Sequence, residues 1–326
     1  MSGTASSAEN WQPSASLATA QRRARMLAAA REYFARQNVL EVDTPILSRA
    51  AVSDPNIESV RALLQIDSSR DFYLQTSPEF PMKRLLCAGY PDMYEICKVF
   101  RDGESGKRHQ PEFTMVEWYR RSFELQDIID DTLAFIAALV GPEVLSAPPH
   151  QISYQEAFLE YASVDPLHAT VEELVLCADC DAQLQAALGE RRDAWLDLVL
   201  TRKVAPRFDG DRLTILSHYP ASQASLARLT PGNAAVADRF EVFFGDLELA
   251  NGYVELTDGS EQRMRCARDL ELRRAAGRPL PPLDEAFLAA LDAGLPACAG
   301  VALGFDRLLM IDAATDDIRD VQNFPF

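Results

Sequence analysis

Apolar residues near the start of the chain follow the spacing of a helix. In "SLATAQRRARMLAAAREYFARQN", Met26, Ala30 and Phe34 recur every four residues and so share one face. Ser16 is a suitable N-cap before this run, and Asn38 is a suitable C-cap after it. The pattern therefore predicts one long helix between Ser16 and Asn38.

Strand patterns follow this helix. In "VLEVDTPIL", polar and apolar residues alternate up to Pro45, which predicts a short strand that stops at proline and suits a sheet edge or an interface. The segment "DFYLQTSPEFPMKRLLCAG" predicts a strand from Phe72 to Gln75, a turn, and a helix that begins near Pro78. "MYEICKVF" and "EFTMVEWYR" also alternate, and they predict an antiparallel hairpin with a long connecting loop.

The second half of the chain mixes both patterns. Residues 122–215 are mostly helical in pattern and predict a helical insertion. Strand patterns return in "LTILSHYP", "DRFEVFFGDLELANGYVEL" and "GVALGFDRLLMI". This mixture indicates an α+β fold, an antiparallel sheet flanked by helices. We expect residues 1–15 to be a flexible lead, and residues 16–326 to form one domain that contains the insertion.

The composition excludes some classes of protein. A chain of 326 residues with 48% hydrophobic residues can bury a large core. No apolar stretch approaches the roughly 18 residues of a membrane helix, and no secretory signal is present, so we expect a soluble, cytoplasmic protein without a membrane partner. Cys177 and Cys180 form the one C-x-x-C pair. Without further ligands this pair predicts two thiols rather than a zinc site.

The charge bears on possible partners. A net charge of −17 opposes binding to nucleic acid, because that affinity depends largely on lysines and arginines that neutralise phosphates. A local basic pocket is still able to hold a small anion such as a nucleotide. The stretch "RDGESGKRHQPEFTMVEWY" is one candidate, since Arg101 ends a strand and a guanidinium there can clamp a phosphate. An exposed, charged hairpin tip is the alternative.

Two other groups of residues point to nucleotide chemistry. Glu241 and Glu248 flank the turn signal Gly245-Asp246, so they are expected on neighbouring strands of a hairpin. Two close carboxylates repel unless a cation lies between them, and Mg²⁺ prefers such oxygen ligands. In "CAGVALGFDRLLMI", a glycine-bracketed strand leads to Arg307 at a helix start, where phosphate binding is favoured. The alternatives are a solvated strand face and simple helix capping.

Together these segments resemble the catalytic domain of a class II aminoacyl-tRNA synthetase of the lysyl type. "FARQNVLEVDTPIL", "VFRDGESGKRHQPEFTMVEWY" and "GVALGFDRLLM" resemble its motifs 1, 2 and 3, in the right order. "TSPEFPMKRLL" and "ELANGYVELTD" are similar to the lysyl signatures. The resemblance covers the chain from about residue 20 to its end. It implies that ATP is a substrate, that Mg²⁺ is a cofactor, and that the protein is a homodimer joined through motif 1.

The resemblance also implies site residues. Arg101 and Arg307 would be catalytic, holding the α- and γ-phosphates of ATP, and Glu241 and Glu248 would hold Mg²⁺. The implied ATP site comprises Arg101, Asp102, Gly103, Glu104, Gln110, Glu248, Leu249, Gly304 and Arg307. The implied amino-acid site comprises Ser77, Pro78, Glu79, Tyr119, Asn251, Glu255 and Ala302. A diammonium substrate needs acids at both ends, and Glu79 and Glu255 supply two.

The chain resembles most the shortened lysyl-type ligases that attach (R)-β-lysine to a lysine of elongation factor P. Motif 1 begins after barely twenty residues, so we expect no anticodon-binding domain and disfavour tRNA as a partner. No residue is an obvious nucleophile, so we expect an adenylate and then direct transfer to the acceptor. The alternatives are a minimal lysyl-tRNA synthetase, a free amino-acid ligase and a non-catalytic paralogue.

Two positions depart from the family pattern. The glutamate that usually follows the motif 2 arginine by two residues is here one residue late, at Glu104, with Gly103 in its place. Either Glu104 reaches the adenine, or the backbone at Asp102 and Gly103 does so. Ala302 stands where full lysyl synthetases usually have glycine, and its methyl group is a hypothesis for favouring a β-amino acid over an α-amino acid.

Overall fold

The computed structural model describes residues 11–141 and 143–326. Most of the predicted flexible lead therefore lies outside the described residues. Its last part is held in place, since the backbone N–H groups of Ser14 and Ala15 donate to the carbonyls of Asn323 and Gln322, at 2.7 and 3.2 Å. The two ends of the described chain are thus neighbours.

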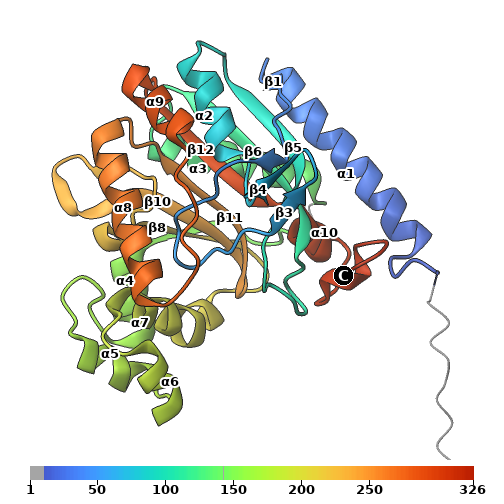
Figure 1. Ribbon diagram of the computed structural model, residues 1–326. Coiled ribbons are helices and arrows are strands. Elements are labelled where there is room, and N and C mark those ends of the chain that lie inside the picture. Colours follow the sequence, from blue (N-terminus) through green and yellow to red (C-terminus); the bar gives the residue numbers. More distant parts are fainter. Residues whose placement is uncertain (1–10, 142) are drawn as a thin grey trace, which may run out of the picture.

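A mixed sheet forms the centre of the molecule (Figure 1). Its strands, within the described residues, are β1 (Leu40–Glu41), β5 (Met93–Phe100), β6 (Glu112–Arg121), β7 (His150–Ser153), β8 (Leu213–Pro220), β9 (Leu229–Thr230), β10 (Asn233–Phe244), β11 (Leu247–Val254) and β12 (Cys298–Gly304). The order is β1-β5-β6-β12-β11-β10-β8-β7, and β9 pairs with β10. The inner pairs are antiparallel, and the parallel pairs β1–β5 and β7–β8 lie at the two edges. The predicted α+β class is confirmed.

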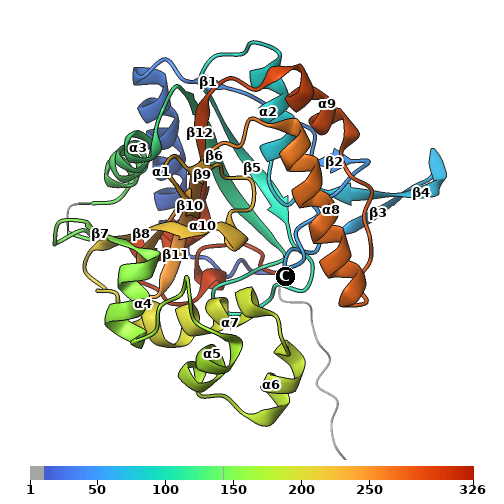
Figure 2. The ribbon, with the colours of Figure 1, turned by 90° about the vertical axis from the view of Figure 1, so that its left-hand side faces the viewer.

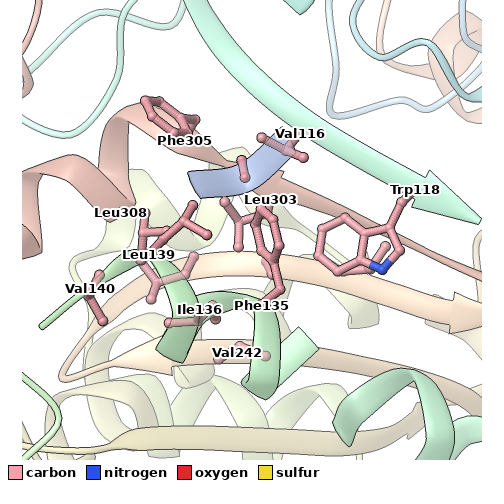
Figure 3. Close-up of a cluster of buried hydrophobic side chains, with 14 of the residues drawn as sticks. Val116, Trp118, Phe135, Ile136, Leu139, Val140, Val242, Leu303, Phe305 and Leu308 are labelled. Carbon is pink, nitrogen blue, oxygen red and sulfur yellow. The ribbon is translucent and has the colours of Figure 1, made fainter. Parts of the chain in front are cut away.

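One face of this sheet carries the largest core. Helices α1 (Leu17–Arg36), α3 (Leu125–Leu139) and α10 (Phe305–Asp312) cover it. Phe34 of α1 stacks on Tyr94 with ring centroids 4.1 Å apart, and it also stacks on Phe135 of α3. Figure 3 shows Phe135 beside Trp118, Leu303 and Val242 of the sheet. These apolar residues alternate along their strands, so the intervening residues point to the opposite face.

The opposite face is covered only in part. Helices α2 (Glu79–Cys87) and α9 (Glu285–Gly294) pack there on Met93, Tyr119 and Cys298, and α8 (Gly259–Ala275) lies against α9. A small sheet of β2 (Leu47–Ser48), β3 (Arg61–Leu64) and β4 (Asp67–Leu74) projects from the body (Figure 2). The rest of this face is left for a cavity.

The predicted helical insertion over residues 122–215 is too wide. Helix α3 belongs to the main core, and β7 extends the main sheet beside β8. The separate part is the group α4 (Tyr154–Ala162), α5 (Val171–Ala178), α6 (Ala182–Leu188) and α7 (Arg192–Val199), which surrounds Trp195 in a cluster of its own. Cys177 and Cys180 are free thiols in this group.

Helix and strand ends were predicted well, with small differences. Ser16 caps α1 by accepting a hydrogen bond from Thr19 N. The C-cap is Gln37 rather than Asn38, which follows it with a left-handed φ of 56°. β1 is shorter than the alternation predicts but does lie at the sheet edge. None of the helices in the described part of the chain has the length and hydrophobicity that crossing a membrane requires.

Candidate active site

A cavity of about 520 Å³ opens on the partly covered face of the sheet. Its floor is made of strand residues that alternate with those of the main core. Ala302 of β12 pairs with Glu117 of β6 on one side and with Asn251 of β11 on the other. Asn251 in turn pairs with Glu241 of β10. The sheet register therefore brings side chains from four strands to one surface, and all of these residues line the cavity.

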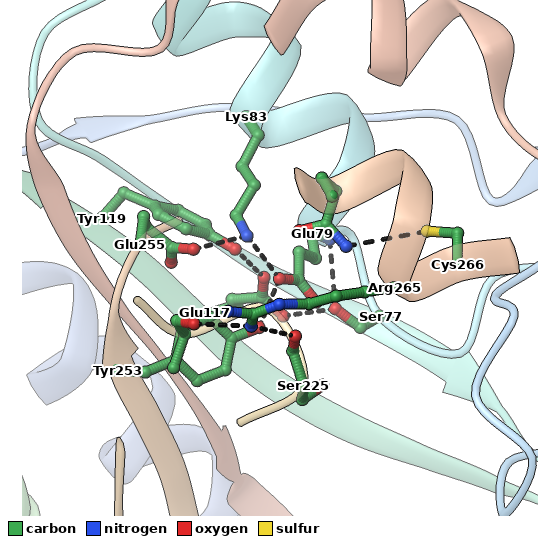
Figure 4. Close-up of polar contacts among 12 residues, drawn as sticks. Ser77, Glu79, Lys83, Glu117, Tyr119, Ser225, Tyr253, Glu255, Arg265 and Cys266 are labelled. Atoms are coloured by element: carbon green, nitrogen blue, oxygen red, sulfur yellow. Dashed lines mark hydrogen bonds and ion pairs between the residues drawn. The ribbon is translucent and has the colours of Figure 1, made fainter. Parts of the chain in front are cut away.

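One end of the cavity is a wall of carboxylates, shown in Figure 4. Glu79 comes from the first turn of α2, Glu117 from β6, and Glu255 follows β11. Glu117 accepts hydrogen bonds from Ser77 Oγ at 2.6 Å and from the Tyr119 hydroxyl at 2.7 Å. We call Glu79, Glu117 and Glu255 the acidic wall.

Burial shifts the pKa values of two residues of the acidic wall, Glu117 and Glu255. Burial and the neighbouring Glu79 raise the pKa of Glu117 to about 8. Burial also raises the pKa of Glu255 to about 8, against the attraction of Lys83 and with the repulsion of Glu79 and Glu117. Glu255 Oε1 has no hydrogen-bond partner among the described residues. An unpartnered buried oxygen and raised carboxyl pKa values indicate a place for a cationic ligand.

Two glycines and an alanine shape this end. A Cβ on Gly300 would come within 2.4 Å of the Tyr119 ring and 2.8 Å of Glu255 Oε1, so glycine allows the ring to lie against the strand. Ala302, the next residue on the same face, lines the cavity opposite Glu117 and Asn251. Gly304 also lines it, one step nearer the other end.

The other end of the cavity is basic. Arg101 lies over the ring of Phe113, with its guanidinium carbon 5.2 Å from the ring centroid, and it is 3.9 Å from Glu104. Its buried Nε has no hydrogen-bond partner in the described chain. Arg307 lies in the first turn of α10, and its guanidinium is held by Glu248 O at 2.8 Å and by His109 Nε2 at 2.8 Å. Two guanidinium groups facing one cavity form a site for a polyanion.

Two carboxylates border the basic end. Glu241 is buried and Glu248 is half-buried, and both line the cavity. Burial and Glu248 raise the pKa of Glu241 to about 7, although Arg239 bonds to it at 2.6 Å. This repulsion is what a bound divalent cation relieves, so Glu241 and Glu248 fit Mg²⁺ held together with substrate phosphates. No group of three or more metal-ligating side chains occurs in the part of the chain that the structure describes.

The structure brings most of the predicted site residues to this cavity but not all of them. Pro78, Asp102 and Gly103 do not line it. Pro78 is the N-cap of α2, and the Asp102 N–H donates to Glu58 O at 2.8 Å. The predicted residues that do line the cavity are Ser77, Glu79, Arg101, Glu104, Gln110, Tyr119, Glu241, Glu248, Leu249, Asn251, Glu255, Ala302, Gly304 and Arg307.

Several lining or supporting residues were not identified from the sequence. Lys83 lies behind the acidic wall, and its i, i+4 spacing from Glu79 was the available signal. Asp193 and Asp197 of α7 line the cavity, so the helical group borders it. The C-terminal tail also approaches the site, since the Phe326 N–H donates to Gln110 Oε1 at 2.9 Å.

Comparisons with known proteins agree with this geometry. Residues 11–326 match the family model described as tRNA synthetases class II (D, K and N). A protein of Proteus mirabilis (strain HI4320) named elongation factor P–(R)-β-lysine ligase is 43% identical over 320 residues, which is 97% of each chain. A protein of the same name from Avibacterium paragallinarum is 41% identical over 98% of each chain. Another from Klebsiella pneumoniae (strain 342) is also 41% identical, over 96% of this chain and 97% of its own.

Proposed function

Because the chain belongs to the class II tRNA synthetase family of the D, K and N type, we propose that it is a ligase that activates (R)-β-lysine with ATP and transfers it to elongation factor P. The acidic wall is the observation that carries the proposal. Three carboxylates at one end of the cavity, of which Glu117 and Glu255 are buried, suit an amino acid with two ammonium groups. The names of the relatives specify the β-amino acid and the protein acceptor.

The first step is adenylation. A carboxylate oxygen of β-lysine attacks the α-phosphorus of ATP, and pyrophosphate leaves. Arg101 holds the α-phosphate and Arg307 the γ-phosphate, so both guanidinium groups neutralise charge and align the reactants. Mg²⁺, held by Glu241 and Glu248, would neutralise phosphate charge when bound. Glu104 is the residue we assign to the adenine, since it lines the cavity beside Arg101 whereas Asp102 and Gly103 do not.

The second step is transfer. The neutral ε-amino group of an acceptor lysine attacks the carbonyl carbon of the adenylate, AMP leaves, and the amine loses a proton as the amide forms. No enzyme nucleophile is required. The free amino-acid ligase, the minimal lysyl-tRNA synthetase and the non-catalytic paralogue predict other outcomes for the same assay. A homodimer and a cytoplasmic location are further proposals that rest on the family resemblance.

The experiment that tests this function is the intact mass of elongation factor P. The acceptor is incubated with the chain, ATP, Mg²⁺ and (R)-β-lysine, with tRNA as a parallel acceptor. We expect a gain of one lysyl unit on the protein and none on tRNA. Charging of tRNA alone would indicate a minimal synthetase, and the absence of any adenylate would indicate a non-catalytic paralogue.

A further inference from the structure

A buried lysine supports the acidic wall from behind. Lys83 is 1% exposed and does not line the cavity, whereas its two partners do. Its Nζ lies 2.6 Å from Glu79 Oε1 and 2.5 Å from Glu255 Oε2 (Figure 4). The ammonium group also lies 5.3 Å from the centroid of the Tyr253 ring. Lys83 thus contacts two sides of the amino-acid end without contacting the space where a substrate would lie.

Stabilising the fold does not by itself explain why a charged lysine is buried here. Taking an ammonium group out of water is costly, and a buried pair often stabilises a protein no more than apolar side chains of similar volume. The surroundings of Lys83 include apolar groups, among them Phe287, whose ring centroid is 6.0 Å from its Nζ. Burial lowers the pKa of a lysine, but Glu255 and Glu79 outweigh this effect and raise the pKa of Lys83. The side chain is therefore held in its charged form.

We propose that Lys83 is an internal counter-ion that sets the charge of the acidic wall to match a substrate with two ammonium groups. This inference rests on the proposed function and deepens it. Glu79, Glu117 and Glu255 carry three negative charges when ionised, and Lys83 carries one positive charge. The surplus of two negative charges equals the charge of the two ammonium groups of β-lysine.

Two further charged groups lie near the cluster. Buried Glu95 of β5 is opposite Glu117 in the sheet register but does not line the cavity; burial raises the pKa of its carboxyl, and the Thr44 N–H donates to it at 3.2 Å. Arg265 of α8 lines the cavity, but its guanidinium is paired with Glu261 of the same helix. The thiols and phenols that face the cluster are neutral when protonated, and burial raises the pKa of each: Cys87 on α2, Cys97 on β5, Tyr119 on β6, Tyr253 on β11, Cys266 on α8 and Cys298 on β12.

Lys83 is consequently a positioning residue. It fixes Glu79 and Glu255, which approach from α2 and from the end of β11, at one distance from each other. Without its charge, the three carboxylates of the acidic wall would repel one another, and one would hold a proton that has to leave before an ammonium group can bind there. Amino-acid affinity would fall while the ATP end of the cavity would remain unchanged.

The test is a double-mutant cycle on the full chain, read by ATP–pyrophosphate exchange. Lys83→Met leaves the wall with three uncompensated acids, Glu117→Gln leaves it one acid short, and the double variant restores the surplus of two. We expect Lys83→Met to raise the KM for β-lysine by about tenfold or more, since removing one partner of a buried pair leaves an unpaired charge. The KM for ATP should stay within about twofold, because ATP binds at the other end.

The double variant should have a lower KM for β-lysine than Lys83→Met alone, and its thermal stability should be higher. Independent roles would instead give additive losses. Lys98→Met removes a half-exposed lysine of β5 and is the matched control. If Lys83→Met does not fold, a folded double variant that still activates β-lysine supports the proposal, and failure of both to fold overturns it. A folded Lys83→Met with an unchanged KM for β-lysine also overturns it.

The pH dependence of the KM for β-lysine distinguishes an electrostatic role of Lys83 from a role in packing alone. In wild type, the KM for β-lysine should fall as the pH rises and the carboxyl groups of the acidic wall ionise. In Lys83→Met this fall should occur at higher pH, because loss of the lysine charge raises the pKa of these carboxyl groups. A merely structural role would leave the profile in place. If the wild-type protein activates a diamino acid but transfers nothing to elongation factor P, the proposed acceptor is wrong. The double-mutant cycle still tests the role of Lys83 in that case, because it is read by ATP–pyrophosphate exchange and needs no acceptor.

Discussion

The two ends of the cavity differ in how their charged side chains are paired and how far they are exposed. At the amino-acid end, Glu117 and Glu255 of the acidic wall are buried, and Lys83 compensates part of the wall's charge from within the core. At the ATP end, Arg101 and Arg307 are partly exposed. Arg101 lies 3.9 Å from Glu104 of the loop, and Arg307 contacts His109 of the same loop and the Glu248 carbonyl of β11. The first arrangement is preorganised, whereas the second has to exchange protein contacts for phosphate contacts.

The loops explain this contrast. The 101–111 loop is held by the C-terminal tail, since Ile318 N donates to Lys107 O at 2.7 Å and Phe326 N to Gln110. The acidic wall instead comes from a helix and central strands. Substitutions at the ATP end should therefore act on the rate of adenylation, and those at the amino-acid end on substrate affinity.

The largest effect is expected at the ATP end. Arg101→Ala should reduce ATP–pyrophosphate exchange by about a hundred- to a thousandfold, as loss of a preorganised charge-stabilising group typically does. Arg61→Ala, on the exposed β3 strand, is the control. Full exchange in Arg101→Ala would contradict the assignment of this end to ATP.

A smaller effect is expected at the acidic wall. Glu255→Gln should raise the KM for β-lysine by about ten- to a hundredfold, because a hydrogen bond to a charged group contributes about 1.5–3 kcal/mol. The KM for ATP should change little. Glu112→Gln, at an exposed end of β6, is a matched control. A parallel rise in both constants for Glu255→Gln would remove the distinction between the two ends.

The pH dependence should also differ between the ends. The pKa values of Glu117 and Glu255 are raised to about 8, and the substrate's ammonium groups favour the ionised carboxylates. Binding therefore releases protons, and the KM for β-lysine should fall as the pH rises from about 6.5 to about 8.5, by at most about tenfold per unit for each group. Steady-state kinetics across this range would refute the account if the KM were constant or rose.

The smallest effect concerns Ala302. Its methyl group lies on the cavity floor opposite Glu117 and Asn251. Ala302→Gly should shift the preference between β-lysine and α-lysine by about tenfold, the scale of one methyl group in a pocket. Ratios of kcat/KM for the two amino acids measure the shift, and an unchanged ratio would eliminate the hypothesis.

Local pattern accounts for much of what the sequence predicted. The helix cap at Ser16, the hairpin around Gly245 and the strand-to-helix step before Arg307 depend on nearby residues, and the structure has each of them. The contact between Lys83 and Glu255 depends instead on how α2 packs against the sheet. Its signal, a Glu-Lys pair at helical spacing, is identical to that of an exposed helix pair, so burial was not predictable.

The insertion shows the same limit. The helical pattern of 122–215 was visible, but not that α3 joins the main core while α7 brings Asp193 and Asp197 to the cavity. Likewise, the sequence shows that the acid expected at position 103 stands instead at Glu104. It does not show which of these residues faces the cavity; the structure shows that Glu104 does and Gly103 does not.

The central claim is that the amino-acid end selects two ammonium groups, and a matched pair of substrates tests it directly. ATP–pyrophosphate exchange is measured with (R)-β-lysine and with its analogue that lacks the terminal amino group. We predict that kcat/KM falls by about a thousandfold or more for the analogue, because a site built to pair a polar group rejects a substrate without it. A difference of less than about tenfold would contradict the account, since one methylene already gives that much discrimination.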